Sequence, residues 1–174
     1  MIITGLVTFI AAYHYFRIFN SWVEAYEWNS DGSLSASGIP FDDAYRYMDW
    51  LLTVPLLLIE IILVMKLDAD ETRSKSISLG AAAALMIILG YPGEVVLDAS
   101  QLGTRWFWWT AAMIPFVYIV YTLLVGLKDA TNSESDPKVR GLIVWAQLAT
   151  VISWCTYVET WDWRNDHDKK NRRL

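Results

Sequence analysis

The chain has 174 residues, of which 55% are hydrophobic and 19% are charged, and it carries a formal net charge of −5. Ordinary soluble domains are about 45–50% apolar and about 25% charged, so this balance excludes a soluble enzyme and a disordered tail. The acidic charge excludes a nucleic-acid-binding protein, because phosphate recognition needs clustered Lys and Arg. A single cysteine, Cys155, excludes an intrachain disulfide and a thiolate metal cluster, and no metal site is predicted.

Stretches without formal charge indicate the membrane-spanning segments. A transmembrane helix needs about 20 predominantly apolar residues to cross the hydrocarbon core. Three uncharged stretches qualify after residue 75, and two further apolar segments precede them. The sequence therefore predicts an all-α, multi-pass transmembrane bundle with spans at about residues 2–28, 41–66, 75–98, 103–127 and 137–160.

The loops predict an orientation. Loops 66–75 and 128–140 together hold six basic residues, whereas loops 29–40 and 92–105 hold only Arg105. Because cytoplasmic loops carry the excess of Lys and Arg, the first two loops and the N-terminus are placed on the cytoplasmic side. Five basic residues after residue 157 then fall on the outer side, so residues 158–174 are predicted to be a charged tail outside the bundle.

Two acidic residues lie in the second span. Asp49 and Glu60 are eleven residues apart, which returns them to within roughly 20° of one helix face and separates them by about 16 Å along the axis. Acidic groups inside a membrane are costly and mark ion or proton pathways. The pair is therefore predicted to be a two-station proton relay, with no enzymatic reaction.

The surroundings of the two carboxyls differ. Arg46 precedes Asp49 by one turn and favours its ionised form as a proton acceptor, and Thr53 follows by one turn. Apolar residues surround Glu60 and disfavour its charged form, as suits a proton donor. The alternative is a structural Arg46–Asp49 pair and a Glu60 that reaches the cytoplasmic boundary.

The segment RYMDWLLTVPLLLIE, residues 46–60, resembles the third helix of microbial rhodopsins, especially those of the proteorhodopsin and xanthorhodopsin group. The segment GLVTFIAAYHYFRIFNSW, residues 5–22, resembles the second helix of that family. The resemblance covers residues 2–157 and the second to sixth of seven family helices. It implies retinal as the chromophore, held through a protonated Schiff base by a lysine of the seventh helix.

The resemblance also implies a role for each polar residue. Asp49 is the primary proton acceptor and counterion with Thr53 as its partner, and Glu60 is the donor. Arg46 tunes the acceptor, and His14 matches the histidine that hydrogen-bonds it; alone, His14 would be read as a packing residue. The implied function is a light-driven outward proton pump in the cell (inner) membrane, with lipid and protons as partners and a homo-oligomer as an assembly known in the family.

The family match further implies a retinal pocket, although aromatic residues at helical spacing are more often packing or interface residues. Leu57 resembles green-absorbing variants. A bulky Trp109 stands where carotenoid-binding xanthorhodopsins have Gly, so no carotenoid antenna is predicted. The pocket positions are Trp50, Leu57, Met86, Gly90, Trp109, Trp154 and Tyr157.

The departures from the family concern its first and seventh helices. All lysines fall in predicted loops or the tail, so none is expected to reach the bundle centre beside Asp49. The chain is therefore expected to be an incomplete gene product, with a truncated start and a frame change or premature end after Tyr157. Two alternatives remain: a photosensory rhodopsin, which Glu60 argues against, and a non-photochemical five-helix membrane remnant.

Overall fold

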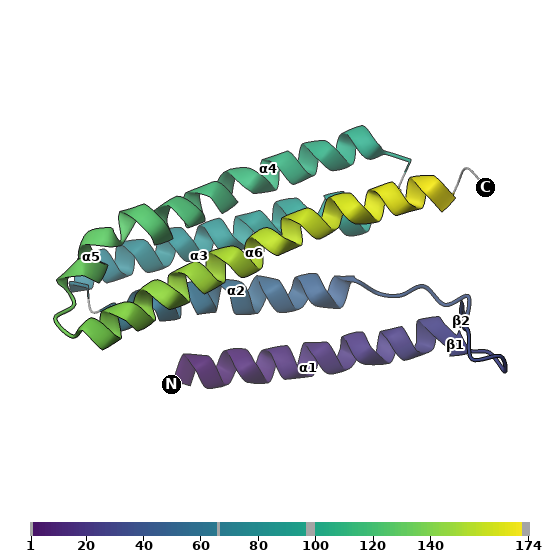
Figure 1. The fold of residues 1–174 in the computed structure, drawn as a ribbon, viewed down its shortest axis with the longest axis horizontal. Helices are drawn as coiled ribbons and strands as arrows, with labels where there is room; N and C mark the ends of the chain where they lie inside the picture. The colour runs from purple at the N-terminus through teal and green to yellow at the C-terminus, as the bar shows by residue number, and fades with distance from the viewer. Residues whose placement is uncertain (1, 66, 97–99, 172–174) are drawn as a thin grey trace. The chain divides into compact units, whose positions relative to one another are not determined.

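The computed structural model describes residues 2–65, 67–96 and 100–171, with the backbone alone for residues 129, 133 and 156–171. Helices dominate the described chain, which confirms the predicted all-α class (Figure 1). The elements are α1 (Ile2–Ala25), β1 (Tyr26–Trp28), β2 (Leu34–Ala36), α2 (Ala44–Val64), α3 (Ala69–Tyr91), η1 (Pro92–Val96), α4 (Leu102–Tyr121), η2 (Thr122–Gly126), α5 (Lys128–Ser133) and α6 (Pro137–Asn171). They form two compact units, Met1–Ile119 and Val120–Leu174, which are described separately.

Helices α1 and α2 lie side by side and antiparallel, joined at one end by the β1–β2 hairpin (Figure 1). The buried residues Val7 and His14 of α1 are seven positions apart, so they share one helix face. Most other side chains of α1 are exposed, including large aromatic ones such as Phe9 and Phe16. Because only one face of α1 is buried, α1 contacts α2 through a narrow stripe of side chains.

The centre of the first unit lies between α2 and α3. The side chains of Leu58 and Ile62 on α2 and Leu79 and Ala83 on α3 are completely buried. Gly80 allows the two helices to approach, because a Cβ at this position would lie 3.5 Å from Cδ1 of Ile59. This interface fixes the helix that carries both membrane carboxyls.

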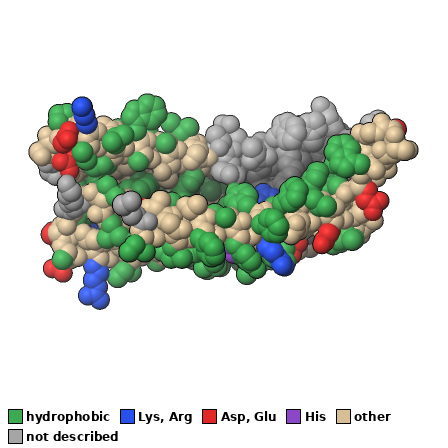
Figure 2. Space-filling view, turned by 90° about the horizontal axis from the view of Figure 1, so that it is seen from below, with side chains coloured by type: hydrophobic (Ala, Val, Ile, Leu, Met, Phe, Trp, Pro, Cys, Tyr) green, Lys and Arg blue, Asp and Glu red, His purple; other side chains and the backbone are tan. Residues whose placement is uncertain are grey.

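Four helical stretches of the described chain are long and apolar enough to cross a membrane: Ile2–Ala25, Ala44–Val64, Ala69–Val96 and Leu102–Asn132. They correspond to the first four predicted spans. The fifth, residues 137–160, is the first part of α6, and its side chains from 156 onward lie outside the described residues. Figure 2 shows many apolar side chains along one face of the molecule, with acidic side chains toward both ends.

Three local features differ from the expected spans and loops. The first span was expected to reach residue 28, but α1 ends at Ala25 because Tyr26–Trp28 form strand β1, which pairs with β2 across a turn that the Gly32 N–H closes on the Asn29 carbonyl. The third helix begins at Ala69, because the Asp68 carboxylate caps it by accepting the Glu71 backbone N–H at 2.8 Å. Its far end continues as the π-helix η1, which shortens the loop expected at 92–105.

The second unit holds the turn between η2 and α6. The Thr131 hydroxyl of α5 donates to the backbone carbonyl of Leu127 at 2.9 Å and accepts a bond of 3.4 Å from the Gln147 amide of α6. Both side chains are buried, and the bond between them gives the Gln147 amide and the Thr131 hydroxyl a hydrogen-bond partner away from water. Helix α6 runs through the predicted tail as far as Asn171.

Candidate functional site

Both membrane carboxyls of α2 meet residues of α1. The Asp49 side chain is only 3% exposed, and its carboxyl interacts electrostatically with the buried His14. Near the other end of the same helix pair, the Thr4 hydroxyl donates a hydrogen bond to Oε1 of Glu60. Asp49 and Glu60 therefore face one neighbour, as the eleven-residue spacing predicted.

Two further contacts extend this row toward the hairpin. The Arg17 guanidinium donates to the Tyr45 hydroxyl at 2.6 Å, with its central carbon 4.9 Å from the centre of the Tyr45 ring. The Asp42 backbone N–H donates to the Ser21 hydroxyl at 2.9 Å. Polar side chains of α1 thus follow α2 along much of its length, in the antiparallel order of the two helices.

The polar atoms around Asp49 are incompletely paired. Oδ1 of Asp49 and Nδ1 of His14 are buried and have no hydrogen-bond partner among the described residues. The Thr53 hydroxyl donates to the Asp49 backbone carbonyl at 2.9 Å, so it fixes the local helix rather than bonding the carboxyl. Buried polar atoms normally have partners, and exceptions often mark a functional group.

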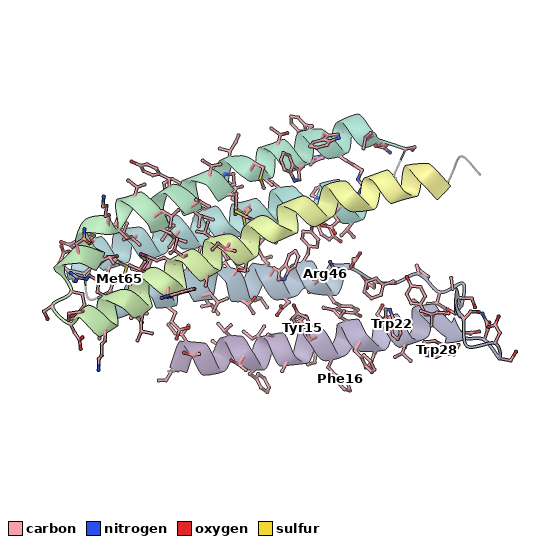
Figure 3. All side chains as sticks on the ribbon, viewed as in Figure 1. Tyr15, Phe16, Trp22, Trp28, Arg46 and Met65 are labelled. Atoms are coloured by element: carbon pink, nitrogen blue, oxygen red, sulfur yellow. The ribbon has the colours of Figure 1, made fainter. Side chains whose placement is uncertain are left out.

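Arg46 contacts residues other than Asp49. Its guanidinium forms an ion pair with Asp43, one turn earlier, and lies 5.9 Å from the centre of the Trp50 ring. Figure 3 shows Arg46 in the first turn of α2, at the end of the helix near the hairpin. The structure thus places the Arg46 guanidinium one turn before Asp49, with Asp43 as its ion-pair partner.

The predicted pocket positions are distributed over both units. Trp50, Met86, Gly90 and Trp109 are half-buried in the first unit, and Leu57 is exposed. Gly90 faces Tyr47, because a Cβ on Gly90 would lie 3.8 Å from Cε1 of that ring. Trp154 is half-buried on α6 of the second unit, and the side chain of Tyr157 lies outside the described residues.

Sequence reasoning missed three residues. Thr4 bonds the predicted donor, and Tyr47 donates from α2 to the Glu94 carboxylate at 2.5 Å. The position of Thr4 follows from the others: Glu60 lies eleven residues after Asp49, and Thr4 lies ten residues before His14 on an antiparallel helix. No comparable signal pairs Tyr47 with Glu94, 47 positions away.

Residues 1–161 match the family described as Bacteriorhodopsin-like protein, ending close to the boundary expected at residue 157. The chain belongs to this family. It is 26% identical over 155 residues to a green-light absorbing proteorhodopsin of Gamma-proteobacterium EBAC31A08, covering 89% of this chain and 55% of the relative. It is 35% identical over 127 residues to archaerhodopsin-2 of Halobacterium sp. (strain aus-2), covering 72% of this chain and 46% of the relative.

Solved structures agree. Xanthorhodopsin, described as a light-driven ion pump with dual chromophore, matches with a TM-score of 0.83 and 46% identity, over 90% of this chain and 62% of that one. A thermophilic rhodopsin matches with a TM-score of 0.81 and 47% identity, over 89% of this chain and 61% of that one. The chain spans about half the length of the curated relatives.

These matches confirm a microbial rhodopsin of the proteorhodopsin and xanthorhodopsin group, with part of a seven-helix bundle. Such proteins are multi-pass membrane proteins and light-driven pumps or sensors, so the chain is not an enzyme in the usual sense. The family implies retinal as its chromophore.

Proposed function

We propose that the protein is a light-driven outward proton pump of the cell membrane, and that this chain supplies its two proton-carrying carboxyls. The observation that carries the proposal is the placement of Asp49 and Glu60 on one face of α2 against α1, with His14 and Thr4 as their respective neighbours. Acidic groups within a membrane span are energetically costly, so two of them at different depths in one span mark a proton or ion pathway. A sensor has no need for the second one.

The residues present fit the charge requirement of retinal. When bound through a protonated Schiff base, retinal supplies a light-driven change in proton affinity. A positive group in the bundle needs a buried negative partner, and the unpaired Oδ1 of Asp49 offers one. The lysines whose side chains the structure describes are Lys75 in the second turn of α3 and Lys128 and Lys138 at the starts of α5 and α6, and none of the three is a proposed pocket position.

Each residue of the site then has a defined task. Asp49 holds a negative charge at the bundle centre and takes up a proton, while His14 adjusts its proton affinity electrostatically. Thr53 holds the backbone of Asp49 in place. Glu60 holds a proton on the cytoplasmic side and releases it toward the bundle centre, and Thr4 orients the Glu60 carboxyl. Outward transport follows because the donor lies nearer the predicted cytoplasmic end.

The proposal is tested by expressing the gene with its natural flanking sequence in bacteria supplied with all-trans retinal. Illumination is expected to acidify the medium, as measured with a pH electrode. Asp49→Asn should abolish this signal, and Glu60→Gln should slow turnover about 100-fold, because a positioned proton-transfer group contributes about that much. Glu71→Gln, an exposed carboxyl of α3, is the matched control.

The outcomes separate the candidate functions. A visible band with acidification supports the pump. A band without acidification favours the photosensory alternative, and the absence of a band favours a non-photochemical membrane protein. Membrane fractionation of the same cells tests the cell membrane location, and cross-linking in the membrane tests the homo-oligomer.

A further inference from the structure

Tyr47 lies at the junction of α2, α3 and η1, away from the row that contains Asp49. Its side chain is 8% exposed, and its ring centre lies 5.3 Å from those of Trp50 and Tyr91. Two residues correspond to about 200° of helical rotation, so Asp49 faces α1 whereas Tyr47 faces α3. The proton relay proposed above therefore makes no use of Tyr47.

Two features of α3 and η1 accommodate the Tyr47 side chain. A Cβ on Gly90 would lie 3.8 Å from Cε1 and 3.9 Å from the hydroxyl oxygen of Tyr47, so the ring covers the bare backbone of Gly90. About one turn further on, the Glu94 carboxylate accepts the Tyr47 hydroxyl at 2.5 Å. The ring is thus held over Gly90 by a charge-assisted hydrogen bond, a strong type of hydrogen bond.

The segment that carries Glu94 is itself fixed to α4. Nε of Arg105 donates to the Gly93 carbonyl at 2.7 Å, and both residues are buried. A Cβ on Gly93 would lie 3.2 Å from Cβ of Trp108 and 3.3 Å from the Arg105 carbonyl, which only glycine avoids without displacing backbone. The close packing of η1 on α4 therefore determines where Glu94 meets Tyr47.

We infer that Glu94 is a positioning residue that anchors Tyr47, and that the anchored ring forms one wall of the retinal pocket at its Gly90 end. The inference rests on the proposed function, because Gly90 and Trp50 border retinal only if the chain belongs to a retinal-binding protein. Tyr47 contacts both of these positions. Release of the Tyr47 hydroxyl then uncovers Gly90 and changes the surroundings of the chromophore.

The anchor is tested first in the retinal-free chain, by the reactivity of a thiol placed under the ring. Gly90→Cys is made together with Cys155→Ser, which removes the exposed native thiol, and N-ethylmaleimide labelling is timed by mass spectrometry. Tyr47→Phe, Glu94→Ala and their combination should each raise the labelling rate by about 3-fold or more, as expected for loss of one interhelical hydrogen bond in a membrane protein. Tyr45→Phe is the matched control. Tyr45 lies two residues before Tyr47, and its hydroxyl accepts a hydrogen bond from Arg17 rather than bonding Glu94.

Equal effects of the two single variants, with no further increase in the double variant, support the anchor. Tyr47→Phe keeps the ring and removes only the hydroxyl, so an unchanged labelling rate in this variant overturns the anchor. The anchor is also overturned if the increase in the double variant equals the product of the increases in the two single variants. Helix content by circular dichroism identifies any variant that has lost its fold, and Tyr47→Phe is the variant that decides.

The wall is tested second, in the retinal-loaded product of the whole gene. Tyr47→Phe and Glu94→Ala should shift the absorption maximum by the same amount, with no additional shift in the double variant and none in Tyr45→Phe. An unshifted band overturns the inference. If the wild-type product forms no visible band, the proposed function fails, and the labelling result alone decides whether Glu94 positions Tyr47.

Discussion

At the scale of single residues, Thr4 gives Glu60 a defined orientation. The Thr4 hydroxyl lies in the first turn of α1 and donates across the helix pair to Oε1 of Glu60. In the proposed donor role, in which Glu60 carries a proton, this bond to Oε1 favours the other carboxyl oxygen as the site of that proton. Interhelical hydrogen bonds of membrane proteins are worth about 0.6 kcal/mol on average, enough to orient a side chain without holding its proton permanently.

Thr4→Val removes this hydroxyl and keeps the branched shape. We expect the C=O stretching band of protonated Glu60 to move to higher frequency in infrared spectra of the chain in lipid, because the carbonyl loses a donor. Glu60→Gln identifies the band by its disappearance. Thr8→Val serves as the control, since the Thr8 hydroxyl donates to the Thr4 backbone carbonyl at 2.8 Å and not to a carboxyl. A band unchanged by Thr4→Val would show that Thr4 does not orient Glu60.

The sequence predicted the shared face of Asp49 and Glu60, because helical geometry alone determines it. It did not predict the partner of Arg46. Two carboxylates, Asp43 and Asp49, each lie three residues from Arg46, and both spacings permit contact on a helix. The choice of Asp43 depends on side-chain rotamers and on the Trp50 ring beneath the guanidinium, which no spacing rule contains.

At the scale of elements, the β1–β2 hairpin is stabilised by its own turn. Gly32 has a φ of 80°, a conformation that residues with a side chain rarely adopt, and its N–H donates to the Asn29 carbonyl at 3.0 Å. The Asp31 carboxylate accepts bonds from the hydroxyl of Ser33 at 2.6 Å and from its backbone N–H at 2.9 Å. Trp22 and Trp28 flank this end of α1 (Figure 3).

These bonds lower the pKa of Asp31, with the Ser33 hydroxyl as the larger cause and the Ser33 backbone N–H as the second. Because the folded-state pKa lies below the unfolded one, the bonds stabilise the hairpin at neutral pH. This contribution is lost as the pH falls through the folded pKa. Ser33→Ala should therefore raise the Asp31 pKa toward its ordinary value, as measured by carbon NMR of the labelled carboxyl. Ser35→Ala, which removes a hydroxyl bonded to Asn29, should leave it unchanged.

Apolar length predicted the four spanning helices well, whereas their ends and connections depended on finer chemistry. The Asp31–Gly32 pair is a recognised turn signal, but the strands on either side hold three residues each, too few to show an alternating pattern. The cap at Asp68 could have been identified from the Glu three residues later. The π-helices η1 and η2 could not, because one additional residue per turn leaves no compositional trace.

At the scale of the whole molecule, the residues of the proposed pump fall into two groups. The carboxyls, their α1 neighbours and most pocket positions belong to the unit Met1–Ile119, whereas Trp154 belongs to Val120–Leu174. Both proton-carrying groups of the proposed pump therefore belong to the first unit. Variants of the second unit should change colour and retinal stability more than the order of proton transfers.

Energy collection by a second pigment depends on the surface beside the chromophore, and in the proposed retinal pocket Trp109 of α4 contributes to that surface. Its indole is half-buried and packs edge-on against Trp106, with the ring centres 5.3 Å apart. A carotenoid lying across the bundle needs an open slot at this position, and a large, packed ring fills it. The retinal-loaded product of the gene, given a carotenoid, should therefore show no carotenoid bands in its fluorescence excitation spectrum.

Trp109→Gly should open the slot and allow those bands to emerge, with about 1 kcal/mol of helix stability lost to the glycine. Phe107→Gly is the matched control: it removes an aromatic ring from the same helix, and the Phe107 side chain is 64% exposed. If the excitation spectrum of the unsubstituted protein already contains carotenoid bands, the pigment binds beside an intact indole and the filled-slot argument is wrong. If Phe107→Gly gains the bands as readily as Trp109→Gly, loosening of α4 rather than the indole controls access.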